Sequence, residues 1–99
     1  MYVFNFPAIN TTINTVDDRY YQALKIKEEV HEVQDEIENM NIALRNGCIP
    51  RYTTDNYIME LMDVIQACET ALREFDAKHL AQIRSEVIKK NNYRKYYGD

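Results

Sequence analysis

Two short acidic segments carry the side chains of this sequence that are best suited to chemistry. They read EEVHE at residues 28–32 and ELMD at residues 60–63. Residues three or four apart on a helix share a face, with Cβ atoms roughly 5–6 Å apart. Two such pairs on neighbouring helices would converge, and four carboxylates in a small volume require a cation to neutralise them. Mg²⁺ and Mn²⁺ prefer oxygen ligands of this kind. The spacing therefore predicts a divalent-cation site formed by Glu29, Glu32, Glu60 and Asp63.

The first acidic segment lies on a long helical pattern. This helix is expected to begin near Thr15 or Asp17, because either side chain can cap free N–H groups. Glycine readily takes the left-handed conformation that ends a helix, so Asn46-Gly47 predicts the stop. Between these limits, apolar residues recur at steps of four and three. They are Ile26, Val30, Val33, Ile37, Met40 and Leu44.

The position of each carboxylate around this helix indicates which acidic residues can bind a cation together. At about 100° per residue, Glu29 lies roughly 60° from the centre of the apolar stripe. Glu32 and Glu36 lie further round on the same side, whereas Glu28 points nearly the opposite way. Glu29 and Glu32 are therefore the better ligand pair, and Glu36 is a candidate extra ligand. Glu28 is left as a group behind the ligands, a contact to another subunit or a solvated side chain.

The second acidic segment lies on a helix with two apolar faces. Residues 48–54 are expected to form a connector, and Thr54 or Asp55 can cap the helix that follows. Its large apolar residues, from Ile58 to Phe75, form a stripe that is expected to pack on the first helix. A second face of small residues then needs another partner, since the helix is apolar over more than half of its circumference. This second face consists of Val64, Ala67 and Ala71.

A third helix is expected from about Ala77 to Asn91, with Leu80, Ile83 and Val87 inward. It offers too few large residues to cover the Val64-Ala67-Ala71 face. We therefore expect a second copy of the chain to cover that face through a two-fold interface, the commonest symmetry. A homodimer or a homotetramer would satisfy this requirement, with the C-terminal tail of one chain near the acidic cluster of another.

Composition limits the chain to one all-α domain. Its 99 residues include two Gly and two Pro, which favours long helices over strands and turns. Residues 1–14 form an arm without periodicity, and residues 15–97 form the helical core and a basic tail. The sequence contains no run of about 18 apolar residues, so it predicts no membrane span. The N-terminus lacks the features of a signal peptide. Two cysteines fit a reduced, cytoplasmic setting, and a net charge of −4 argues against nucleic-acid binding.

The pattern EExxE, a spacer of 27 residues and ExxD resembles the MazG-like all-α nucleotide pyrophosphohydrolases. The resemblance spans roughly residues 20–97. It includes the tail Lys90-Asn91-x-x-Arg94-x-Tyr96-Tyr97, which is similar to a KNxxRxYY-like ending of phage and bacterial members, although many of them carry Gly where this chain has Lys95. The resemblance implies a helical bundle completed by oligomerisation. It also implies catalytic residues Glu28, Glu29, Glu32, Glu60 and Asp63, and substrate contacts from Lys90, Asn91, Arg94 and Tyr97.

The expected activity is hydrolysis of a nucleoside triphosphate between its α and β phosphates, with Mg²⁺ or Mn²⁺ as cofactor. Phosphoribosyl-ATP pyrophosphohydrolase is the alternative within the same chemistry. A non-catalytic helical interaction module is the alternative from another class. In that case the acidic residues are a solvated helix face, and the basic tail merely complements a helix dipole. The sequence does not distinguish which nucleotide is the substrate.

Overall fold

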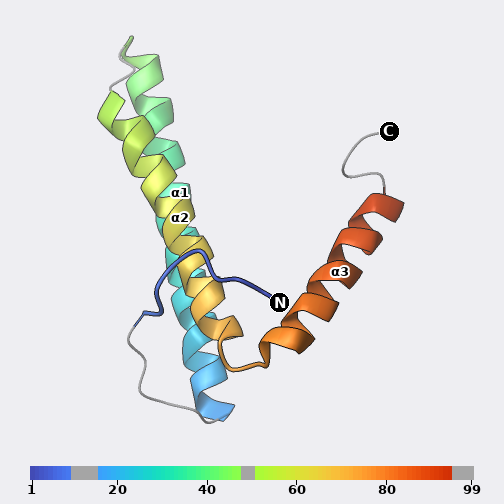
Figure 1. Ribbon diagram of the computed structural model, residues 1–99. Helices are drawn as coiled ribbons and strands as arrows, with labels where there is room; N and C mark the ends of the chain where they lie inside the picture. The colour runs from blue at the N-terminus through green and yellow to red at the C-terminus, as the bar shows by residue number, and fades with distance from the viewer. Residues whose placement is uncertain (10–15, 48–50, 95–99) are drawn as a thin grey trace.

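The structure is a computed structural model of residues 1–99, and it describes residues 1–9, 16–47 and 51–94. The described residues form three helices, α1 (Val16–Arg45), α2 (Arg51–Leu72) and α3 (Ala77–Tyr93), and none of them forms a strand. The predicted all-α class is therefore confirmed. Helices α1 and α2 form an antiparallel hairpin, and α3 leaves the end of α2 at a steep angle (Figure 1).

Most of the helix boundaries agree with the sequence. Helix α1 ends at Arg45, followed by Gly47 with φ +76°, as the left-handed stop requires. Helix α3 begins after Asp76, whose side chain accepts the N–H of His79. Helix α2, however, begins at Arg51, so the prediction of a connector through residue 54 is wrong. A proline restricts the residue before it and does not prevent the residues after it from being helical.

The α1–α2 seam follows heptad spacing, but carboxylates occupy part of it. The seam residues of α1 are buried or half-buried at steps of four and three, namely Gln22, Ile26, Glu29, Val33, Glu36, Met40 and Ala43. Those of α2 are Tyr57, Glu60, Val64, Ala67 and Ala71. In a coiled coil these positions are normally apolar. The two helices therefore place acidic side chains where a purely structural hairpin would place leucines.

The face of α2 that packs on α1 is the one with small residues. Ala67 is 0% exposed, and Ala71 lines a cavity of about 250 Å³ together with Ala23 and Ile26 of α1. The large stripe lies on the outside, where Ile65 is 46% exposed. The prediction that this stripe packs on α1, with the small face left for a second subunit, is therefore wrong. The seam thus combines small alanines on α2 with long glutamate side chains from both helices.

The N-terminal arm, residues 1–9, is fixed to α2 by a buried carboxylate. Glu69 is 3% exposed, and its two oxygens accept the N–H of Asn5 at 3.1 and 3.0 Å. The same carboxylate accepts the N–H of Phe6 at 2.9 Å and the side-chain amide of Asn5 at 3.2 Å. Glu69 lies nine residues after Glu60, about half a turn round the helix. The arm therefore crosses the side of α2 opposite to Glu60 (Figure 1).

Three neighbours of Glu69 complete this attachment, which we call the arm clamp (Gln66, Glu69, Thr70 and Arg73). Gln66 donates to the carbonyl of Pro7 at 2.9 Å, and Thr70 accepts the N–H of Ile9 at 3.1 Å. Arg73 donates to the carbonyl of Phe6 at 2.6 Å, and its guanidinium lies 4.1 Å from the centre of the Phe4 ring. The arm thus packs on the domain itself.

Helix α3 leaves much apolar surface uncovered. Leu80 is buried as predicted, whereas Ile83 and Val87 are exposed, so their inward assignment is wrong within the single chain. The radius of gyration is 16.8 Å, against about 13 Å for a compact chain of 100 residues. The accessible surface is 7973 Å², against about 5,900 Å² for a compact monomer of this mass. The single chain therefore exposes about 2,000 Å² more than a compact monomer would.

Candidate metal centre

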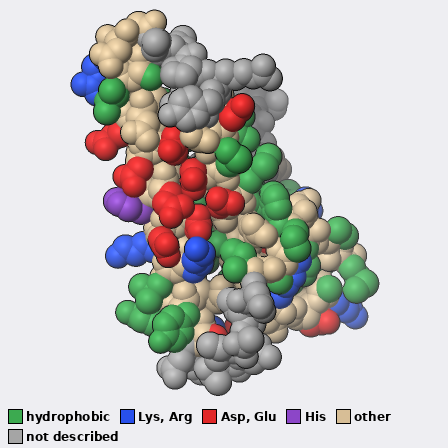
Figure 2. All heavy atoms as spheres, turned by 90° about the vertical axis from the view of Figure 1, so that its left-hand side faces the viewer, with side chains coloured by type: hydrophobic (Ala, Val, Ile, Leu, Met, Phe, Trp, Pro, Cys, Tyr) green, Lys and Arg blue, Asp and Glu red, His purple; other side chains and the backbone are tan. Residues whose placement is uncertain are grey.

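The hairpin brings together carboxylates from both acidic segments. Glu29 comes from the middle of α1, and Glu60 and Asp63 come from the first half of α2. One oxygen of each lies within 4.8 Å of the others. Figure 2 shows the acidic side chains gathered on one face of the hairpin, with apolar side chains beside them. Three of the four predicted ligands therefore meet at one point of the seam.

The fourth predicted ligand, Glu32, lies beside this group. Its carboxyl is hydrogen-bonded with Glu60, and this bond is the main reason why the pKa of Glu32 is raised from 4.5 to about 7. Burial and the negative charges of Glu29 and Glu60 raise this pKa further. Glu32 therefore retains a proton at a pH where an ordinary glutamate has lost it. We refer to Glu29, Glu32, Glu60 and Asp63 as the acidic cluster.

Several oxygens along the seam are buried without a hydrogen bond. Oε2 of Glu29, of Glu36 and of Glu60 is buried and has no hydrogen-bond partner among the described residues. Glu29 as a whole is 6% exposed. A buried carboxylate oxygen without a partner is costly, because it has lost water and gained nothing in exchange. A bound cation would remove that cost, and the all-oxygen donor set suits Mg²⁺ or Mn²⁺. The residues present therefore fit a divalent cation.

A lysine that the sequence analysis did not single out contacts the acidic cluster. Nζ of Lys25 lies 2.9 Å from Oε1 of Glu29, one helical turn away. The hydrogen bond to Glu29 raises the pKa of Lys25, and the charges of Glu29, Glu28 and Glu32 act in the same direction. The spacing of Lys25 and Glu29 by four residues is the sequence signal that could have identified this pair.

The remaining predicted site residues lie elsewhere. Glu28 is exposed, as its position around the helix predicts, and it is not one of the three carboxylates that meet. Lys90 and Arg94 are exposed and Asn91 is half-buried, at the end of α3 that points away from the hairpin (Figure 1). Tyr97 lies outside the described residues. Within one chain, the described part of the tail therefore does not reach the acidic cluster.

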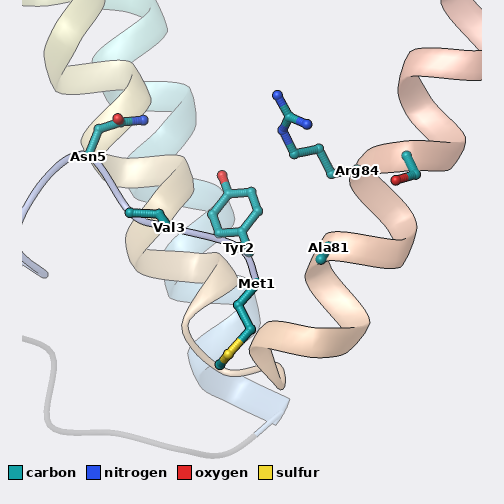
Figure 3. Close-up of a pocket in the computed structure, with 7 residues that line it drawn as sticks. Met1, Tyr2, Val3, Asn5, Ala81 and Arg84 are labelled. Carbon is teal, nitrogen blue, oxygen red and sulfur yellow. The ribbon is translucent and has the colours of Figure 1, made fainter.

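A pocket of about 430 Å³ separates the arm from α3. Arg84 reaches from α3 toward the arm across this space (Figure 3). None of the described residues that line the pocket is a carboxylate, so the pocket is separate from the metal centre and lacks its anionic ligands. Its lining residues are Met1, Tyr2, Val3, Asn5, Ala81, Arg84 and Ser85.

The chain matches no protein-family model, no curated protein and no solved structure. None of the described helices combines the length and the apolar character needed to cross a bilayer.

Proposed function

We propose that this protein is a Mg²⁺-dependent nucleoside triphosphate pyrophosphohydrolase that releases a nucleoside monophosphate and pyrophosphate. One observation carries the proposal: Glu29, Glu60 and Asp63 converge from two helices in a seam that leaves buried carboxylate oxygens without partners. The resemblance of the EExxE and ExxD motifs to the MazG-like enzymes supports the same reaction. Phosphoryl chemistry of this kind depends mainly on positioning and charge neutralisation.

The residues of the acidic cluster have different roles in this proposal. Glu29, Glu60 and Asp63 hold the metal, directly or through water. A metal bound there would supply charge neutralisation at the phosphates and would lower the pKa of a bound water. Glu32 neighbours Glu60. A bound cation would favour its ionised form, which could then act as the base for that water. Glu28 completes the motif from the exposed side of α1.

The substrate contacts come from a second copy of the chain. Lys90 and Arg94 suit phosphate binding, and an aromatic side chain such as Tyr97 can stack on a base. Because the end of α3 points away from its own hairpin (Figure 1), these residues serve the acidic cluster of another chain. The excess accessible surface and the exposed stripe of α2 supply the area for a homodimer or a homotetramer. The protein needs no nucleic acid and no membrane for this role.

Phosphoribosyl-ATP hydrolysis would use the same metal chemistry and is a second candidate substrate. The exposed apolar surface of α2 and α3 would also serve a non-catalytic helical interaction module. Such a module, however, gains nothing from buried carboxylate oxygens without partners.

A panel of nucleoside triphosphates and phosphoribosyl-ATP, with pyrophosphate detection and Mg²⁺, tests the proposal. Glu29→Gln and Glu60→Gln should each lower turnover by at least about 100-fold, since loss of even an outer-shell partner costs 10–100-fold. Their metal-free melting temperatures should be unchanged or higher, because removing a charge relieves crowding.

Glu28→Gln is the matched control, since it makes the same change on the neighbouring, exposed glutamate, and its loss should be smaller. Absence of pyrophosphate release from every substrate would refute the proposed function. Near wild-type turnover in Glu29→Gln or Glu60→Gln would refute the ligand assignment.

A further inference from the structure

Lys25 is a partly exposed side chain that forms an ion pair with a buried one. Its side chain is 39% exposed, whereas that of its partner Glu29 is 8% exposed, and Nζ meets Oε1 at 2.9 Å. The Lys25 ammonium group therefore covers one oxygen of Glu29, a member of the acidic cluster. The other oxygen of Glu29 is buried and has no hydrogen-bond partner among the described residues. One oxygen of Glu29 is thus occupied by a cation, and the other is unused.

A divalent cation and the Lys25 ammonium group would compete for the Glu29 carboxylate. Two cations held at the same carboxylate repel each other, and a doubly charged ion repels the ammonium group more strongly than a singly charged one would. The ammonium group can move into solvent, because lysine has a flexible four-carbon stem and this side chain is already partly exposed. Metal binding would therefore displace Lys25 without disturbing the helix that carries it.

We propose that Lys25 occupies the cation position of the acidic cluster in the metal-free protein and binds a substrate phosphate when the metal is present. This inference rests on the proposed function and adds a positioning residue to it. A displaced ammonium group one turn from Glu29 remains within reach of a phosphate held at the cluster. An ammonium group forms charge-assisted hydrogen bonds to phosphate oxygens. Lys25 thus has one partner in each state of the site, a carboxylate before metal binding and a phosphate after it.

The test compares Lys25→Gln with Lys27→Gln, which removes the same charge from an exposed position two residues away. The first measurement is Mn²⁺ binding to the metal-free protein without nucleotide, by electron paramagnetic resonance of free Mn²⁺. Lys25→Gln should bind Mn²⁺ about three- to tenfold more tightly, since it loses a competitor worth about as much as a partly exposed ion pair. The second is KM for the preferred triphosphate, which should rise at least about fivefold. Lys27→Gln should change neither value by more than about twofold.

Opposite changes, with the metal bound more tightly and the substrate more weakly, are not expected from a lysine that only stabilises the fold. Lys25→Arg keeps the positive charge and should restore KM toward the wild-type value. Weaker or unchanged Mn²⁺ binding in Lys25→Gln, or an unchanged KM, would overturn the inference while leaving the proposed function intact. A wild-type protein that binds no Mn²⁺ and hydrolyses no triphosphate would instead overturn the proposed function, and this inference with it.

Discussion

Glu32 should make the metal-free protein less stable as the pH rises from 5 to 8. The pKa of Glu32 is about 7 in the folded chain, against an ordinary 4.5, first because of its hydrogen bond with Glu60 and then because of burial. Between these two values the folded chain holds a proton that the unfolded chain has lost. Stability therefore falls with pH. The contribution of Glu32 is complete below about 4.5 and is lost as the pH rises through about 7.

The structure also sets the size of this effect. A rise from 4.5 to about 7 would correspond to at most about 3 kcal/mol. Glu32 is partly open to solvent, which weakens such interactions, so we expect a loss of about 1–2 kcal/mol. The ion pair between Arg19 and Glu74 does not contribute in this range. It lowers the pKa of Glu74, and its effect is therefore lost only in more acidic solution.

Urea denaturation at pH 5, 6, 7 and 8 in the presence of EDTA measures the effect. Glu60→Gln should reduce the loss, because it removes the main cause of the raised pKa of Glu32. Glu28→Gln should leave the loss unchanged, and it provides the matched control. Saturating Mg²⁺ should abolish the loss, since a bound cation favours the ionised carboxylate.

Two results would refute this reasoning. The first is a free energy of unfolding that stays level or increases between pH 5 and pH 8. The second is an equal loss in Glu60→Gln and in the wild type, which would assign the pH dependence to groups outside the acidic cluster.

Four further predictions concern the tail, the outer and inner faces of α2, and the arm. Lys90→Ala and Arg94→Ala should raise KM with little change in kcat, as steady-state kinetics would show; an unchanged KM in both would leave the end of α3 as a solvated helix end. Ile65→Arg should convert an oligomer into a monomer by light scattering at micromolar concentration, and a monomeric wild type would contradict the assembly. Ala67→Arg should instead destabilise the hairpin, because Ala67 is fully buried there. Glu69→Ala should lower the free energy of unfolding by about 2–3 kcal/mol in urea denaturation, and a change below about 0.5 kcal/mol would mean that the arm clamp is unimportant for stability.

Local sequence signals predicted the helices and the pairing of the carboxylates, because both depend on residues three or four apart. The choice of the α1-facing side of α2 could not be predicted in the same way. Periodicity shows that Ala67 and Ile65 lie on different faces, but hydrophobicity alone favours the larger residue for the interior. The seam instead combines the small Ala67 with long glutamate side chains, a pairing that hydrophobicity does not predict. Nothing in the sequence near Glu69 distinguishes it from a solvated glutamate, since its partners lie 63 and 64 residues away.

This separation has a consequence during synthesis of the chain. The arm leaves the ribosome before α2, because Glu69 follows Asn5 by 64 residues. At about 5–20 residues per second, the arm clamp is made roughly 3–13 s after the segment that it binds. During this interval Phe4 and Phe6 have no α2 to pack on. The hairpin, whose two helices are neighbours in the chain, can form before the arm closes its much longer loop. The arm is therefore made before the helix that it binds, and it reaches its native position after the hairpin has formed.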